Sequence, residues 1–234
     1  MRFDRSSFSR PCAGNFFSRP CAGSSFISLF ALILIATVFA AAPCSAQTLG
    51  QYTTAVIAPD GEGGCFISTG KDEFRLGIMA RFRMFSKGDL GFQVGFDRLT
   101  GENSLGVATD VKIYLLDPDS TFPVDLAADI SLGHFQDNAL GRTVAGLSLI
   151  TSGTLAADTK IPIEPYASIG FYSIFFTDRE ECPPGAVDCD DDNNDMETVL
   201  RAGVKLVLTD EYQVLFEVKL DGNTTLGAAI NVVF

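Results

Sequence analysis

The amino-acid sequence predicts an all-β protein, a closed antiparallel up-and-down transmembrane β-barrel of ten strands, with eight strands as the alternative. Three observations lead to this fold. Apolar and polar residues alternate along most of the chain with the period of two that a strand requires. Short connections alternate with longer or more polar ones. The last segment, 224–234, alternates to the end of the chain and finishes on an aromatic residue, Phe234.

Residues 1–46 are interpreted as a leader and secretory signal peptide. An arginine-rich start precedes an apolar run from Phe26 to Ala42, which is the order of residues in a signal peptide. Small residues at Cys44 and Ala46 suit cleavage after Ala46. We therefore expect 47–234 to form a single barrel domain. An uncleaved anchor helix is the alternative, because the run approaches the length that spans a bilayer.

The first strand is expected within Tyr52–Thr69, because the topology needs one more strand before Phe74. Either 52–58 or 65–68 supplies it, on the two sides of the interruption at Pro59–Gly64. The next four strands form two hairpins, since turn residues at Ser86–Asp89 and Asp117–Ser120 separate cleanly alternating segments. These four segments are 74–84, 90–96, 105–115 and 124–132.

The second half of the barrel contributes five more strands. Segment 142–154 alternates less cleanly, because Val144 and Ile150 fall on the opposite face from Leu147 and Leu149. The remaining four alternate well. They are 161–175, 198–208, 212–220 and 224–234.

The closing strand also indicates a location. It resembles the last strand of bacterial outer-membrane β-barrels, whose assembly machinery reads a terminal aromatic residue preceded by alternating hydrophobic residues. The residues that carry the resemblance are Leu226, Ile230, Val232 and Phe234. The resemblance implies a bacterial outer-membrane protein whose partners are the barrel assembly machinery, membrane lipid and lipopolysaccharide. At the level of architecture the whole mature chain is similar to the OmpA and OmpX type of barrel.

Connection lengths predict the topology. Short connections are expected at 86–89, 117–121, 156–160 and 209–211, and longer ones at 98–104, 134–142 and 178–196. Outer-membrane barrels keep short turns in the periplasm and long loops outside. We therefore expect the N- and C-termini of the mature chain in the periplasm, and a monomer. A soluble lipocalin-like barrel, which would turn its apolar face inward, is the competing interpretation.

With the apolar face toward lipid, the charged face lines the lumen. A barrel of this size is just wide enough for side chains to fill, so the charges are expected to pair as a plug, with a narrow ion path as the alternative. The expected lumen residues are Arg75, Arg81, Arg83, Asp97, Asp110, Lys112, Asp125, Asp129, Glu164, Arg201, Lys205, Glu217 and Lys219.

An acidic segment, 178–197, is the most unusual surface feature. We hypothesise that it binds divalent cations such as calcium weakly and bridges them to lipopolysaccharide, although it does not match the EF-hand pattern. Its candidate ligands are Asp188, Asp190, Asp191, Asp192 and Asp195. Cys182 and Cys189 are the natural disulfide pair across it, which leaves Cys65 free. A solvated acidic loop is the competing interpretation, and no other cofactor is expected.

The single histidine offers the only enzymatic interpretation. The stretch His134–Ala139 resembles the histidine motif of outer-membrane lipid A deacylases, but Gln136 stands where that family has its serine. Without the hydroxyl that a base would activate, no catalytic residue is assigned. The sequence thus favours a non-enzymatic barrel with a structural or adhesive role carried by surface loops, ahead of a narrow pore and of a lipid-modifying enzyme. The net charge of −12 argues against nucleic acid as a partner.

Overall fold

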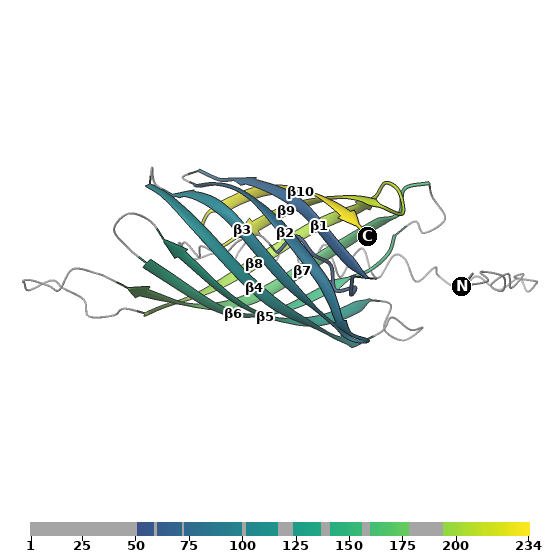
Figure 1. Ribbon diagram of the computed structural model, residues 1–234, viewed down its shortest axis with the longest axis horizontal. Helices are drawn as coiled ribbons and strands as arrows, with labels where there is room; N and C mark the ends of the chain where they lie inside the picture. Colours follow the sequence, from purple (N-terminus) through teal and green to yellow (C-terminus); the bar gives the residue numbers. More distant parts are fainter. Residues whose placement is uncertain are drawn as a thin grey trace, which may run out of the picture. The chain divides into compact units, whose positions relative to one another are not determined.

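The computed structural model describes residues 51–58, 60–71, 73–99, 102–116, 124–136, 141–155, 160–177 and 194–234. The expected leader and signal peptide, 1–46, lie outside this part of the chain. The described residues form one closed barrel of ten antiparallel strands (Figure 1). The strands are β1 Gly61–Thr69, β2 Glu73–Phe85, β3 Gly88–Leu99, β4 Glu102–Leu116, β5 Asp125–Gln136, β6 Gly141–Ser152, β7 Ile163–Thr177, β8 Asn194–Val207, β9 Tyr212–Leu220 and β10 Thr224–Val233.

The up-and-down topology is confirmed, and ten strands rather than eight close the sheet. Each strand pairs with its sequence neighbours, and β1 pairs with β10 from Glu62 opposite Val233 to Thr69 opposite Leu226. The backbone N–H of Phe234 donates to the carbonyl of Gly61 at 3.0 Å. The Phe234 ring lies edge-on to Phe82, with centroids 6.2 Å apart. The C-terminal aromatic residue therefore packs over the seam that closes the barrel.

The first strand differs from both expected alternatives. β1 starts at Gly61, inside the stretch that was expected to interrupt it, and runs through 65–68. Gly64 pairs with Asn231 on one side and Met79 on the other, and a Cβ on Gly64 would stand 2.2 Å from the carbonyl oxygen of Ile230. The glycines here permit close approach between strands. Residues 51–58 form no strand and are mostly buried inside the barrel.

Large apolar side chains cover the outside of the barrel. Ile78 is 63% exposed and Ile130 is 57% exposed, and both lie in the middle of their strands, β2 and β5. Soluble proteins rarely expose a contiguous apolar surface of more than a few hundred Å². The interior instead holds buried charged residues. This polarity, apolar outside and charged inside, is that of a membrane barrel and excludes the lipocalin-like alternative.

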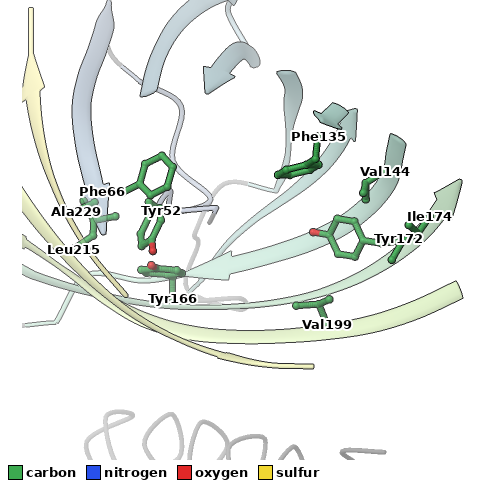
Figure 2. Packing of buried hydrophobic residues seen from close by; sticks show 10 residues of the cluster. All are labelled: Tyr52, Phe66, Phe135, Val144, Tyr166, Tyr172, Ile174, Val199, Leu215 and Ala229. Atoms are coloured by element: carbon green, nitrogen blue, oxygen red, sulfur yellow. The ribbon is translucent and has the colours of Figure 1, made fainter. Parts of the chain in front are cut away.

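Two small apolar clusters contribute to the interior. The larger one contains Tyr52, Phe66, Tyr166 and Tyr172, and Figure 2 shows their rings pointing into the barrel from different parts of the chain. Val144 also belongs to it, and Ile150 packs in the smaller cluster with Ala55 and Ala127. The imperfect alternation of 142–154 therefore has a structural reason, since both of its misplaced residues fill the lumen.

The connections differ from the expected lengths at both ends of the barrel. The expected short connections 117–121 and 156–160 are longer, since the strands leave 117–124 and 153–162 between them. We call the end with the β2–β3 and β8–β9 connections the turn end, and the opposite end the loop end. At the loop end β3 stops at Leu99 and β4 begins at Glu102, because Arg98 pairs with Asn103 inside the expected loop 98–104. The expected loops 134–142 and 178–196 are likewise shortened by strands, to 137–140 and 178–193. Polar residues continue the ladder beyond the apolar belt, so polarity alone misplaced the strand ends.

In the part of the chain that the structure describes, no helix is long and apolar enough to span a membrane.

A charge on the lipid-facing surface should destabilise the barrel according to its depth. Replacing Ile78, near the middle of β2, by arginine should lower the free energy of unfolding in lipid vesicles by about 2–4 kcal/mol. Replacing Met84, near the turn end of the same strand, should cost about 0–1 kcal/mol, because water and headgroups reach it. Urea titrations in vesicles measure both values. Equal costs at the two positions would contradict the assigned membrane face.

Candidate functional site

The lumen is the candidate site, since it gathers nearly all of the buried charge. In its turn-end half, Arg81 lies at the centre of a carboxylate cluster. Its guanidinium donates to Asp89 and, at 2.6 Å, to Oδ2 of Asp110. Glu62 lies within 3.8 Å of its Nε. Because charged hydrogen bonds in a low-dielectric interior are strong, this cluster ties β1, β2, β3 and β4 together.

Lys112 connects the barrel wall to segment 51–58. Its Nζ donates to Oγ1 of Thr53 at 2.9 Å, to the carbonyl of Thr54 at 2.9 Å and to the carbonyl of Val56 at 2.7 Å. Asp89 lies 3.2 Å from the same nitrogen, and both side chains are fully buried. The ammonium group thus has four oxygen neighbours, of which three belong to the segment inside the lumen.

Segment 51–58 makes further contacts around the lumen wall. The Gln51 side chain donates to Ser148 at 2.8 Å and accepts from Ser168 at 3.0 Å. Nearer the turn end, the backbone N–H of Ala55 donates to Ser152 at 3.2 Å and that of Ala58 donates to Asp89 at 3.2 Å. The segment therefore bonds to β3, β4, β6 and β7 at once.

Tyr52 is the most constrained residue of this segment. Its backbone has a φ of 35°, a left-handed value that costs about 1 kcal/mol or more for a residue other than glycine. The ring stacks on Phe66, with centroids 5.1 Å apart. A Cβ on Gly227 of β10 would stand 2.2 Å from its hydroxyl. Packing from β1 and β10 holds the strained conformation, so the segment has a defined seat in the lumen.

A second ion-pair cluster occupies the loop-end half of the lumen. Arg75 pairs with Glu73 at 2.8 Å and with Asp97 at 3.3 Å. Lys219 pairs with Asp221 at 2.6 Å and with Glu73 at 3.3 Å. The hydroxyl of Thr225 also donates to Glu73. Glu73 therefore joins two cations from β2 and β9 across the closing seam.

Arg201 and its aromatic neighbours lie between the two clusters. Its Nη1 donates to the hydroxyl of Tyr172 at 2.9 Å, and its Nε lies 3.6 Å from Glu217. The hydroxyl of Tyr166 donates to the other oxygen of Glu217 at 3.1 Å. Arg142 stacks over a further aromatic ring, that of Phe135, at 4.8 Å. Rings and guanidinium groups thus occupy the lumen from Arg201 to its loop end, where Arg142 lies 3.7 Å from Asp97.

The structure places the expected lumen residues as follows. Twelve of them turn inward on their strands, either buried or partly buried. Arg83 does not, because it lies exposed at the turn end, where its side chain reaches the carbonyl of Ser86 at 3.4 Å. The inward residues are Arg75, Arg81, Asp97, Asp110, Lys112, Asp125, Asp129, Glu164, Arg201, Lys205, Glu217 and Lys219.

Sequence reasoning missed several members of the site. Asp89 was assigned to a turn, although β3 begins one residue earlier and its carboxylate is fully buried. Strict alternation counted back from Asp97 would have found it. Glu73 and Asp221 stand at strand ends, and Arg142 lies in the segment with poor alternation. Nothing in the sequence marked segment 51–58 as an occupant of the lumen, because an irregular chain inside a barrel has no periodicity.

The other expected site residues divide between the lipid face and the undescribed part of the chain. Leu226, Ile230, Val232 and Phe234 are exposed on the outer face, as is Cys65. Asp195 lies in β8 and is exposed. The expected disulfide Cys182–Cys189 and the acidic residues Asp188, Asp190, Asp191 and Asp192 lie outside the described residues. His134 is exposed, with its Nδ1 3.1 Å from the Thr143 hydroxyl on the neighbouring strand.

Comparison with known proteins gives only distant similarities. No family model and no curated protein matches the chain. Among solved structures it is similar to a bacterial polysaccharide outer membrane secretin, with 12% identity over 71% of this chain and 57% of that chain, at a TM-score of 0.44. It is also similar to the β domain of the Bordetella autotransporter BrkA, with 12% identity over 76% of this chain and 100% of that one, at 0.44. The KdgM porin matches at 8% identity over 74% of this chain and 99% of that one, at 0.37.

The closed sheet, its apolar outer surface and its charged interior define the class of the protein. It is a membrane-spanning β-barrel. No family model assigns the chain more narrowly.

Removing the Lys112 charge should destabilise the barrel strongly. The Lys112→Met variant leaves the buried Asp89 and three oxygens of segment 51–58 without their cation, and breaking a buried pair typically costs about 3–5 kcal/mol. Adding Asp89→Asn should recover part of this loss, because it removes the uncompensated carboxylate. Urea unfolding in lipid vesicles measures both. As a control, Arg83→Met at the exposed turn end should change stability by less than about 1 kcal/mol. Similar costs for Lys112→Met and Arg83→Met would contradict the role given to Lys112.

Proposed function

We propose that the protein is a closed, non-enzymatic outer-membrane barrel whose role is structural or adhesive. The observation that carries the proposal is the seating of segment 51–58 inside the lumen, on Lys112 and on the walls of four strands. A lumen that holds a hydrogen-bonded chain together with paired charges has little room for a continuous water column. Interaction with other molecules is then left to the surface beyond the membrane.

The loop end is the side we assign to the cell exterior, with the turn end and the C-terminus in the periplasm. The longest connection, 178–193, leaves the barrel at the loop end, between β7 and β8. Long loops on outer-membrane barrels face outward. The same connection carries most of the acidic segment, so the proposed contacts with divalent cations and lipopolysaccharide belong to this side.

Planar bilayer recordings test the closed state. The purified protein should show little conductance, because ion pairs, aromatic rings and segment 51–58 occupy the bore. Large, steady single-channel steps from the unmodified protein would contradict the proposal and favour the narrow pore.

A variant with an altered segment tests which part closes the barrel. Replacing Gln51, Tyr52, Thr53 and Thr54 together by glycine and serine keeps the chain length but removes the ring of Tyr52 and the side-chain contacts to Lys112, Ser148 and Ser168. Conductance events should become larger or more frequent than in the unmodified protein. A variant that inserts, folds and stays as silent as the unmodified protein would assign the barrier to the ion pairs alone.

One contact allows a direct test of the alternative that the protein is a lipid-modifying enzyme. The contact between His134 and Thr143 brings a base and a hydroxyl together on the outer face, where lipid is accessible. We expect no deacylation of lipid A, since a base and a hydroxyl alone lack the other groups that acyl transfer requires. Mass spectrometry of lipid A incubated with the purified barrel measures this. Deacylation that disappears in both His134→Ala and Thr143→Val would establish the enzyme instead.

A further inference from the structure

A small cavity remains in the lumen beside Gln51, against β3, β4 and β5. Its volume is about 40 Å³, larger than the roughly 10–15 Å³ that one water molecule needs. Oxygen-bearing side chains surround it, contributed by four strands and by the segment itself. They are Gln51, Gln93, Asp110, Asp129, Ser131 and Tyr172.

Two buried oxygens at this cavity lack a hydrogen-bond partner among the described residues. They are Oδ2 of Asp129 and Oε1 of Gln93. Asp129 is 3% exposed and Gln93 is 7% exposed, and both side chains line the cavity. Leaving a buried acceptor unsatisfied typically costs about 1–3 kcal/mol, and more when the acceptor is charged. The two oxygens therefore favour an occupant that accepts their lone pairs.

The charges around the cavity indicate the sign of that occupant. Four carboxylates, on Glu62, Asp89, Asp110 and Asp129, lie around the two cations Arg81 and Lys112. The same half of the lumen also holds the ion pair of Lys205 with Glu164, and Asp125, which accepts from the hydroxyl of Tyr114. Arg81 is bound to the first three of the four carboxylates, and Lys112 to Asp89 and to segment 51–58. Two negative charges remain uncompensated if all four carboxylates are ionised.

Among the described residues, Arg201 is the one cation that lines the cavity itself. Its guanidinium is held by Glu217 at 3.6 Å and by the hydroxyl of Tyr172 at 2.9 Å. Its charge is therefore balanced by Glu217, within the cluster of β7, β8 and β9.

We propose that this cavity is a binding site for a hard divalent cation of the calcium type. Asp129 and Gln93 supply the two unpartnered oxygens, Asp110 supplies the adjacent carboxylate, and water completes the coordination. Carboxylate and amide oxygens are the ligands that calcium takes, in flexible geometry. A charge of +2 would balance the surplus of the four carboxylates around Arg81 and Lys112. The site lies inside the barrel, apart from the acidic segment 178–197, and does not require the closed state proposed above.

Terbium(III) replaces calcium in oxygen sites and luminesces when a nearby tyrosine transfers energy to it, so Tyr172 supplies a built-in reporter. The folded protein in detergent should give saturable terbium luminescence that calcium displaces. Asp129→Asn should weaken the binding of both terbium and calcium by more than about tenfold. Tyr172→Phe should remove much of the luminescence while calcium binding, measured by calorimetry, persists.

Two controls separate this site from the acidic segment and from misfolding. The triple variant Asp190→Asn, Asp191→Asn, Asp192→Asn should keep the displaceable luminescence, because it leaves the lumen intact. Heat-modifiable migration on a gel verifies that each variant is folded. If Asp129→Asn does not fold, Gln93→Met decides by the same readout.

The proposal is overturned if the folded Asp129→Asn or Gln93→Met variant binds terbium and calcium as tightly as the unmodified protein. It is equally overturned if the unmodified protein shows no saturable binding, which would mean that the cavity holds water only.

Discussion

The pairing of β1 with β10 is the interaction on which the rest of the structure depends. In a lipid environment every backbone N–H and C=O must bond within the protein, so a sheet that spans the membrane has to close. The pairing runs the length of β1, from Glu62 to Thr69, and the Phe234 ring packs over its turn end. Once the sheet is closed, the period of two sends one face of every strand to lipid and the other into the lumen.

Closing the sheet places charged side chains inside the barrel, where they need partners. Charges that alternate with lipid-facing residues are forced into a narrow space, where each one must find partners or remain costly. Arg81 binds carboxylates from β3 and β4, and Arg75 binds Glu73 of its own strand together with Asp97 of β3. Lys112 finds partners differently, by taking oxygens from segment 51–58. The segment is therefore part of the charge balance of the wall as well as an occupant of the lumen.

The sequence predicted the fold well and the site only in part, for physical reasons. The alternation in 74–84 or 212–220 directly records which face meets lipid, so strand identity and inward residues such as Arg201 and Glu217 follow from it. The alternation does not show which charged side chains pair with one another. Asp89 was lost because a polar residue beside a glycine is as typical of a turn as of a strand end. The strand ends at Arg98 and Asn103 were misplaced because hydrogen-bonded pairing continues where hydrophobicity stops.

By itself the sequence determined a ten-stranded antiparallel barrel with its apolar face outward, because a period of two is a local property that each strand carries independently. Only the tertiary structure decided what fills the lumen. The seat of segment 51–58, the four oxygens around Lys112 and the cavity between Asp129 and Gln93 each join residues that are distant in the chain. Such contacts follow from the stagger and curvature of the closed sheet, which no single strand encodes.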